Sequence, residues 1–386
     1  MRRGHFLPSI VTALLATAFT SQPVVAQADY NSSAPIAYMV DLSSGSVLYN
    51  RKSKKLIPPA SMAKMLTAYV VFDMITKKQL RLEQKFSLDQ KSFVKWNNIG
   101  STMFLKAGEP VSVSNLLHGL LTLSGNDAAI SLAEGIDGSE QKFVERMNKT
   151  AKKLGMLDSK FGTANGWPDS GKTLTTAQDL SILARRTLSD FPELYAAFYG
   201  KSEFRWGNVT QPNRNPILAT VPGSDGMKTG HTDEAGYCFT GTAKQNGRRL
   251  LIVVAGLQSQ DARATESTAF MKWGFSEWRV KPLFKKSQII GEAKVQLGSA
   301  MSVPLMTPNI VNVTIPIDKE MTYQTAVQYN GPIRAPILKG QHIADLLVTT
   351  NDGRIAIMPL LAERSVDKAG FFGLAWNGFK QLLGMA

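Results

Sequence analysis

The chain has 386 residues, 44% of them hydrophobic and 19% charged, and its formal net charge is +14. The length allows two or three domains, each with its own core. Its single cysteine excludes an intrachain disulfide and a cysteine-cluster metal site, and no His-Glu-x-x-His pattern occurs, so neither metal nor cofactor is expected. The positive charge suggests an anionic polymer or a phospholipid surface as neighbour, although scattered solubilising lysines explain most positions at least as well.

The first residues have the layout of a secretory signal peptide. Arg2 and Arg3 precede an apolar run over residues 6–19, and Ala26-Gln27-Ala28 offers a small-x-small cleavage site. The apolar run is shorter than the roughly 18 to 20 residues of a membrane span. We therefore expect residues 1–28 to be removed on export, which makes nucleic acid an unexpected partner.

The next region alternates between strand and helix patterns. A hairpin over 36–41 and 47–49 leads to a helix that begins at Ser61, after two prolines, with one buried stripe. Helical patterns fill 112–157, with breaks at 124–126 and 135–138, and a Gly- and Pro-rich loop covers 163–175. A helix over 176–188, strands over 226–230, 237–243 and 248–257, and a helix over 261–278 follow. This order predicts an α/β (α+β) domain over residues 29–279, with helices against an antiparallel sheet.

The sequence pattern changes after residue 279. Short apolar alternations separated by Gly, Pro and Asn predict a small all-β domain over residues 280–365. A last segment over 366–386 follows, in which residues 368–386 place four aromatic side chains mainly on one face of a helical wheel. We expect this amphipathic helix to lie on a membrane surface. The alternative is a helix that docks on its own domain.

Three motifs carry the chemistry. Ser61 and Lys64 lie one helical turn apart on one helix face, which is the Ser-Lys form of an activated nucleophile. The Ser-x-x-Lys pattern also occurs at Ser92, Ser139 and Ser365, where it fits ordinary surface residues, Ser139 as a helix cap. Ser124-Gly125-Asn126 lies between two helical runs, and Lys228-Thr229-Gly230 ends a strand before His231-Thr232.

In this order the motifs resemble those of the penicillin-binding proteins and serine β-lactamases. Within that superfamily the chain is most similar to the low-molecular-mass D-alanyl-D-alanine carboxypeptidases, which have Ser-Gly-Asn and Lys-Thr-Gly-His-Thr as second and third motifs. The resemblance implies a serine-type carboxypeptidase that removes the terminal D-alanine from peptidoglycan pentapeptide stems. It also implies acylation by β-lactams and a periplasmic location at the outer face of the inner membrane.

The roles follow from the reaction. Ser61 attacks the carbonyl, and Lys64 takes its proton and must be largely neutral near pH 7, helped by burial and by Lys228 as a second cation. Ser124 relays a proton to the leaving amine. The substrate-binding residues are Asn126, Lys228, Thr229, Gly230 and His231. Lys228 and Thr229 suit the terminal carboxylate, and the resemblance places the oxyanion hole at the backbone N–H groups of Ser61 and His231.

Several alternatives remain open at this stage. A class A β-lactamase needs a glutamate in the loop over 163–169, where Asp169 is the only acid. An endopeptidase would use the same residues, and a non-catalytic scaffold would have a degenerate motif. A Ser-His-Asp triad would need His118, His231 or His342, of which His118 fits a packed core histidine. Arg263 could either reach the site or lie on the surface.

Overall fold

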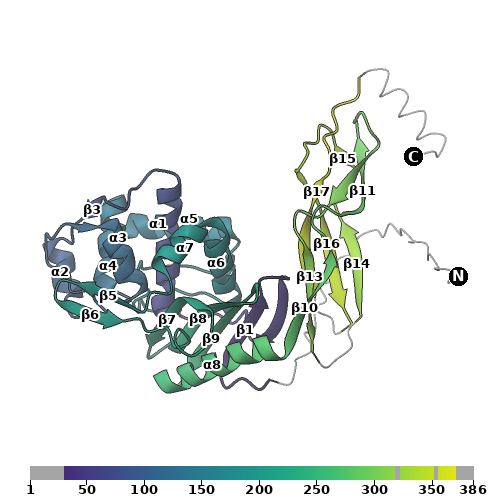
Figure 1. The fold of residues 1–386 in the computed structure, drawn as a ribbon. Helices are drawn as coiled ribbons and strands as arrows, with labels where there is room; N and C mark the ends of the chain where they lie inside the picture. The colour runs from purple at the N-terminus through teal and green to yellow at the C-terminus, as the bar shows by residue number, and fades with distance from the viewer. Residues whose placement is uncertain (1–29, 318–321, 352–354, 371–386) are drawn as a thin grey trace.

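The computed structural model describes residues 30–317, 322–351 and 355–370, and a part rich in helices lies beside a narrow all-β part (Figure 1). The predicted leader and residues 371–386 of the predicted C-terminal helix lie outside the described residues. Val366 and Lys368, which the sequence assigned to that C-terminal segment, instead form isolated β-bridges with Ile337 and Gly298. No helix within the described ranges is long and apolar enough to span a membrane.

A five-stranded antiparallel sheet forms the centre of the first part, with the order β2-β1-β9-β8-β7. Its strands are β1 (Ile36–Asp41), β2 (Ser46–Arg51), β7 (Ser224–Thr232), β8 (Gly236–Gln245) and β9 (Arg248–Leu257). Both ends of the domain therefore build one sheet, as predicted. The central strand β9 pairs with β1 and β8, and its residues 250–255 are completely buried.

Helices cover both faces of this sheet (Figure 1). On one face lie α1 (Lys64–Thr76), α3 (Val113–Leu121), α4 (Asn126–Asp137), α5 (Glu140–Leu154), α6 (Ala177–Asp190) and α7 (Pro192–Phe198), and on the other lies α8 (Gln260–Ser276). Shorter elements complete the domain: η1 (Ala60–Ala63), α2 (Gln90–Trp96), the antiparallel pair β3 (Lys85–Phe86) and β4 (Val111–Ser112), and the hairpin β5 (Glu203–Trp206) and β6 (Val209–Pro212). Ser139 caps α5 by accepting a hydrogen bond from Lys142 N, as predicted for that Ser-x-x-Lys copy.

The helix that follows Ser61 differs from its prediction. The sequence predicted one buried stripe, but every residue of α1 from Lys64 to Phe72 is buried. The helix packs among α3, α4, α5 and α6, so residues 64–72 have no side that faces water. The prediction of an amphipathic helix there is wrong, because a helix that packs on all sides is apolar on all sides.

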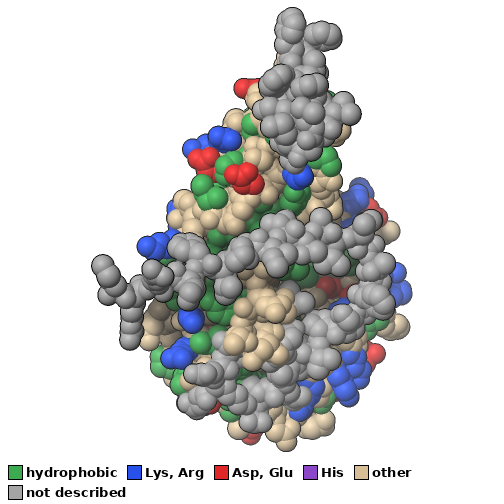
Figure 2. Space-filling view, turned by 90° about the vertical axis from the view of Figure 1, so that its right-hand side faces the viewer, with side chains coloured by type: hydrophobic (Ala, Val, Ile, Leu, Met, Phe, Trp, Pro, Cys, Tyr) green, Lys and Arg blue, Asp and Glu red, His purple; other side chains and the backbone are tan. Residues whose placement is uncertain are grey.

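The second part is all-β, as predicted. β10 (Trp278–Phe284) pairs with β13 (Val311–Pro316), and a six-stranded sheet has the order β14-β16-β17-β12-β11-β15. Its strands are β11 (Ile289–Gln296), β12 (Ser302–Met306), β14 (Tyr323–Gln328), β15 (Ile333–Arg334), β16 (His342–Thr350) and β17 (Ile355–Ala362). Where Figure 2 leaves side chains in view, Lys and Arg lie in several separate places.

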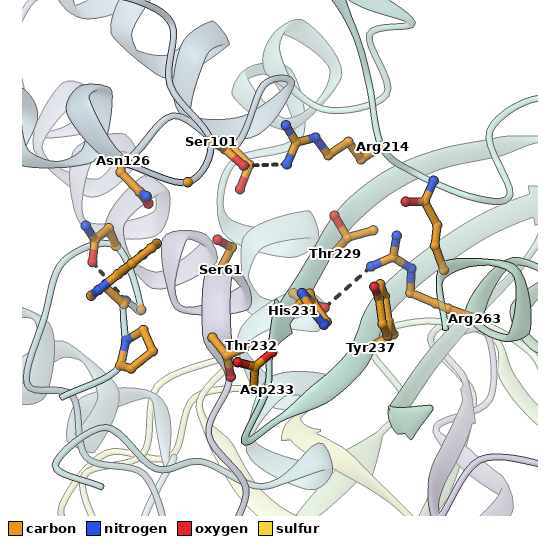
Figure 3. Close-up of a pocket in the computed structure, with 18 residues that line it drawn as sticks. Ser61, Ser101, Asn126, Arg214, Thr229, His231, Thr232, Asp233, Tyr237 and Arg263 are labelled. Atoms are coloured by element: carbon orange, nitrogen blue, oxygen red, sulfur yellow. Dashed lines mark hydrogen bonds between the residues drawn. The ribbon is translucent and has the colours of Figure 1, made fainter. Parts of the chain in front are cut away.

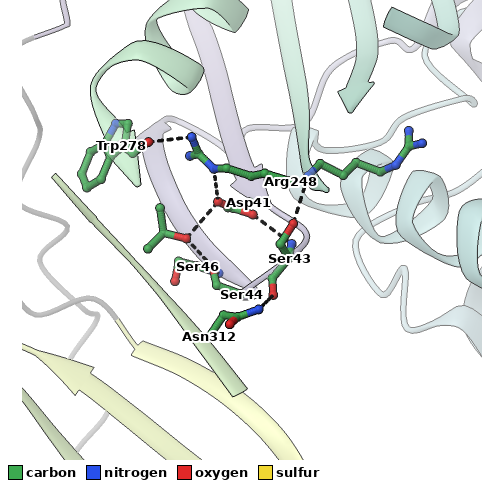
Figure 4. A network of polar contacts seen from close by, with 9 residues as sticks. Asp41, Ser43, Ser44, Ser46, Arg248, Trp278 and Asn312 are labelled. Atoms are coloured by element: carbon green, nitrogen blue, oxygen red, sulfur yellow. Dashed lines mark hydrogen bonds and ion pairs between the residues drawn. The ribbon is translucent and has the colours of Figure 1, made fainter. Parts of the chain in front are cut away.

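A buried polar network joins the two parts (Figure 4). The Asp41 carboxylate, at the end of β1, accepts hydrogen bonds from Arg248 Nε at 2.6 Å and from Thr314 Oγ1 at 2.9 Å. Asn312 Nδ2 donates to the carbonyl of Ser43 at 3.2 Å. Because the Asp41 side chain is 0% exposed, Arg248 is the cation that balances its charge.

Candidate active site

A cavity of about 540 Å³ lies beside the end of β7, between η1, the α3–α4 turn and the loop that contains Trp167. Six of the eight residues singled out by sequence line it, namely Ser61, Ser124, Asn126, Thr229, Gly230 and His231. The other two, Lys64 and Lys228, are 0% and 3% exposed and are not among the lining residues. The structure thus brings the three motifs together around one cavity (Figure 3).

Ser61 lies in a single 3-10 turn that precedes α1. Ala60, the residue before it, has a φ of +48°, which is an uncommon conformation for a residue with a side chain. The turn brings Ser61 Oγ to 2.9 Å from Lys64 Nζ, although Lys64 itself begins the regular helix. The one-turn spacing predicted from the sequence therefore produces the contact.

Lys64 Nζ has two further partners, both of which are oxygen acceptors. It donates to Asn126 Oδ1 at 2.8 Å and to the carbonyl of Asn165 at 2.7 Å. Asn126 Nδ2 donates to the carbonyl of Ile99, which fixes the amide so that its oxygen faces the lysine. A neutral amine has two N–H groups and one lone pair. The two acceptors occupy both N–H groups, and the lone pair is left for the Ser61 hydroxyl.

The pKa of Lys64 is lowered from 10.5 to about 7, chiefly by burial; the Asp127 carboxylate opposes the shift and the Arg214 guanidinium adds to it. The pKa of Lys228 is also held well below its usual value. Burial is the largest cause, and the positive charges of Lys64, Arg214 and Arg263 act in the same direction. The sequence proposed Lys228 as the second cation that acts on Lys64. In the structure Arg214, and not Lys228, is the cation that lowers the pKa of Lys64; its guanidinium cannot lose its proton and so remains a permanent charge.

Gly230 lets β7 pass close to η1. A Cβ at this position would lie 2.6 Å from Pro59 O and 3.2 Å from Ala60 Cβ, so only glycine fits without a shift of the backbone. β7 is an edge strand of the sheet and η1 packs beside it. This explains in physical terms why the third motif has glycine after Lys228 and Thr229.

The second motif forms the turn between α3 and α4. Ser124 has a φ of +66° and is buried at the cavity wall, and such strained residues often occur at functional sites. Asp127 follows in the first turn of α4 and accepts hydrogen bonds from Thr102 Oγ1 at 2.5 Å and from the backbone N–H of Met103 and Leu105. It thereby fastens the segment next to Ser101, which forms another wall.

Sequence reasoning missed several residues of the cavity. Arg214 lines it and hydrogen-bonds to Ser101 Oγ, and Trp167 forms part of the wall on the loop side. Arg263, left open by the sequence, is buried and donates from Nη1 to the carbonyl of Gly230 at 3.4 Å. Both arginines line the cavity, and their guanidinium groups suit a carboxylate ligand.

His231, His118 and Cys238 do not supply a second nucleophile system. The His231 ring stacks on Tyr237 with centroids 3.8 Å apart, and the His118 ring packs against Phe198 and Phe204. Cys238 is buried, which raises the pKa of its thiol to about 11. No group of three or more His, Cys, Asp or Glu side chains that could hold a metal occurs among the described residues.

Comparison with known proteins agrees with this geometry. Residues 21–259 match the family described as D-alanyl-D-alanine carboxypeptidase (peptidase family S11), and residues 278–368 match the C-terminal domain of penicillin-binding protein 5. Fold and matches together define a low-molecular-mass penicillin-binding protein. The chain belongs to the D-alanyl-D-alanine carboxypeptidase family and is a serine hydrolase.

The relatives are similar over almost their whole length. D-alanyl-D-alanine carboxypeptidase DacF of Bacillus subtilis is 31% identical over 94% of this chain and 95% of the relative. DacC of Escherichia coli is 32% identical over 94% of this chain and 90% of its own length. Penicillin-binding protein 5 of Haemophilus influenzae has a similar structure, with a TM-score of 0.76 and 30% identity over 88% of this chain and 99% of that one. Penicillin-binding protein D2 of Listeria monocytogenes, solved in its ampicillin-bound form, covers 65% of this chain and 100% of its own, with 30% identity and a TM-score of 0.56.

Proposed function

We propose that this protein removes the terminal D-alanine from peptidoglycan pentapeptide stems through an acyl-enzyme on Ser61, and that β-lactams acylate the same oxygen. The observation that carries the proposal is the contact of Ser61 Oγ with a completely buried amine, Lys64 Nζ, at 2.9 Å. Membership in the carboxypeptidase family and the ampicillin-bound relative support it.

Acylation begins when Ser61 Oγ attacks the carbonyl carbon between the two D-alanines and its proton moves to Lys64 Nζ. The proton fits there because the charged amine can donate to all three of its neighbours, Ser61 Oγ, Asn126 Oδ1 and the Asn165 carbonyl. No heavy atom has to move between the two protonation states. The backbone N–H groups of Ser61 and His231 bind the developing oxyanion, where one such donor contributes about 3 kcal/mol.

Ser124 then passes a proton to the leaving amine of D-alanine. It lies on the cavity wall with Ser61 and Asn126, and Asn126 holds the peptide group of the substrate. The proton that Ser124 relays is the one that Lys64 took from Ser61, so Lys64 is neutral again in the acyl-enzyme. In the second half of the reaction a water gives its hydroxyl to the acyl carbon and its proton, through Lys64, to Ser61 Oγ, which restores the Ser61 hydroxyl and leaves Lys64 neutral.

The terminal carboxylate of the substrate binds on the β7 side of the cavity. Thr229 offers a hydroxyl there, and the guanidinium groups of Arg214 and Arg263 line the same cavity. Lys228 is buried behind this wall and does not line the cavity. The arginines are the better direct partners because their planar donor groups match a carboxylate.

A β-lactam acyl-enzyme should be released slowly. Asp169, the only acid in the loop over 163–169, accepts hydrogen bonds from Thr173 N at 3.0 Å and Thr173 Oγ1 at 2.5 Å, and it does not line the cavity. It is therefore engaged elsewhere and cannot activate a water at Ser61.

The function is tested by covalent labelling and by product release. Treatment with a fluorescent penicillin should add one adduct to the peptide that contains Ser61, and Ser61→Ala should stay unlabelled. Ser139→Ala is the matched control, since Ser139 also has a lysine three residues later but caps α5. D-alanine release from a stem that ends in D-Ala-D-Ala should disappear in Ser61→Ala. Rapid multiple-turnover hydrolysis of the penicillin, or labelling of Ser61→Ala, would contradict the proposal.

We also propose that the protein is exported to the periplasm and attached to the outer face of the inner membrane through its C-terminal segment. The sequence pattern of residues 1–28 and 368–386 supports this. Because Lys368 pairs with Gly298 in the second domain, the sharpest test truncates the chain after Gly370 and leaves that bridge intact. Full-length protein should sediment with anionic lipid vesicles, and the truncated protein should not. If the two proteins sediment with the vesicles to the same extent, the C-terminal segment is not a membrane anchor.

A further inference from the structure

A second cavity, of about 720 Å³, lies at the opposite end of β7 and β8 from the active site. It is bounded by α6 and α7, by the β8–β9 turn and by the turn after β1, and we name it the α6–α7 cavity. It includes Asp225, near the start of β7, whereas the active site includes Thr229. Four residues of strand separate the two by about 13 Å. No lining residue belongs to both cavities.

The charges of the α6–α7 cavity are unbalanced. Its lining contains four cations and one acid, namely Arg185, Lys201, Lys244, Arg249 and Asp225. Asp225 forms a bidentate pair with Arg249, with N–O distances of 2.8 and 2.6 Å. Arg185, Lys201 and Lys244 form no ion pair with any described residue. Three positive charges around one concave surface attract an anion.

The wall beneath these cations is rigid. Tyr195 OH lies 2.8 Å from Thr242 Oγ1 and 3.0 Å from Asp225 Oδ1, and Thr242 Oγ1 donates to the same carboxylate at 2.7 Å. Arg249 lies over the Tyr195 ring, 5.9 Å from its centroid. A site that is already organised loses little entropy when a ligand binds.

The wall also has unused hydrogen-bonding capacity. Ser224 Oγ and Tyr199 OH are buried, and neither has a hydrogen-bond partner among the described residues. Both residues line the α6–α7 cavity. Both oxygens have almost no accessible surface, so a ligand in the cavity would reach them only after the lining shifts. Leu42 and Pro192 add apolar surface to the same lining.

We propose that the α6–α7 cavity is a second ligand site, separate from the catalytic one, which binds a small molecule that carries carboxylate or phosphate groups. The cations bind the oxyanion, and the apolar wall binds the remainder of the molecule. The volume lies in the range of ordinary small-molecule sites, about 300 to 1,000 Å³. Ligand bound here would contact the starting end of β7, whose other end forms part of the active site.

The test measures binding to the full chain after treatment with penicillin, so that the active site is occupied. The probes are a disaccharide-tetrapeptide peptidoglycan fragment, which carries carboxylates, and inorganic pyrophosphate, which carries phosphates. Titration calorimetry compares wild type with two double variants. Arg185→Gln with Lys244→Gln removes two cations from the α6–α7 cavity, and Arg81→Gln with Lys152→Gln removes the same charge from exposed positions outside it.

We expect at least one probe to bind the wild type. The cavity variant should bind that probe about tenfold more weakly than the control variant does, because it loses two exposed charge contacts with the anion. The probe that binds identifies the anion class. Absence of binding by both probes, or equal loss in the two variants, would overturn the proposal. If penicillin leaves no adduct in a mass spectrum, the proposed function fails, but the comparison of variants still tests this cavity because neither pair lines the active site.

Discussion

The rate at which penicillin acylates this protein should follow the neutral fraction of Lys64. Burial lowers the pKa of that amine from 10.5 to about 7. About one-tenth of the amine is then neutral at pH 6 and about nine-tenths at pH 8. Because only the neutral form accepts the Ser61 proton, the second-order rate constant should rise about tenfold between these pH values and level off above them. An exposed lysine would continue the rise to about pH 10.

The assay is time-resolved labelling with a fluorescent penicillin at fixed ionic strength, from pH 5.5 to 9.5. Lys64→Ala should lose a factor of about 10² to 10⁴ at every pH, the usual contribution of a general base. Arg214→Gln should move the inflection to higher pH, since Arg214 lowers the pKa of Lys64. Arg186→Gln removes an exposed cation on α6 and serves as the control. A rate that still rises tenfold per unit at pH 9 in the wild type would refute the assignment of Lys64 as a base with a lowered pKa.

Two further substitutions test the packing that holds the site. Gly230→Ala places a Cβ 2.6 Å from a backbone oxygen, so we expect a loss of about 1 to 3 kcal/mol in unfolding free energy and slower acylation. Gly291→Ala, where the nearest atom would lie 3.9 Å away, should change neither quantity. Arg248→Met leaves the Asp41 carboxylate buried without its cation, which should cost about 3 to 5 kcal/mol in denaturant unfolding. Lys77→Met breaks an exposed ion pair and should cost under about 1 kcal/mol. Similar losses of stability in Arg248→Met and Lys77→Met would contradict this account of the polar network between the two domains.

The motif residues were predictable because their signals are local. Ser61 follows two prolines and Lys64 lies three residues later, so helix geometry alone brings the two side chains together. The antiparallel sheet was equally accessible, since its strands alternate with turn residues such as Asn246-Gly247, which does form the β8–β9 turn.

The remaining site residues carry no local signal. Arg214 and Asn165 come from irregular segments, and only the tertiary fold places Arg214 at the cavity wall and the Asn165 carbonyl against Lys64. Arg263 lies on α8, where its position in sequence fits a surface residue as well as a site residue. The burial of α1 on all sides was missed for a related reason. Both faces of that helix are covered by segments far away in the chain, and a periodicity argument cannot count such neighbours.

The arginine and the lysine at the cavity have different electrostatic roles, and the difference can be measured. Arginine stays charged at all accessible pH values, whereas a buried lysine titrates. Arg214 therefore adds to the effect of burial in lowering the pKa of Lys64, and in the proposed reaction it also attracts the substrate carboxylate. A bound carboxylate partly cancels the Arg214 charge, so the pKa of Lys64 should be higher in the complex than in the free enzyme. For D-alanine release, kcat should then inflect at a higher pH than kcat/KM, since the first reports the complex and the second the free enzyme. Coinciding inflections, or a lower one for kcat, would show that the carboxylate binds too far from Arg214 to influence the base.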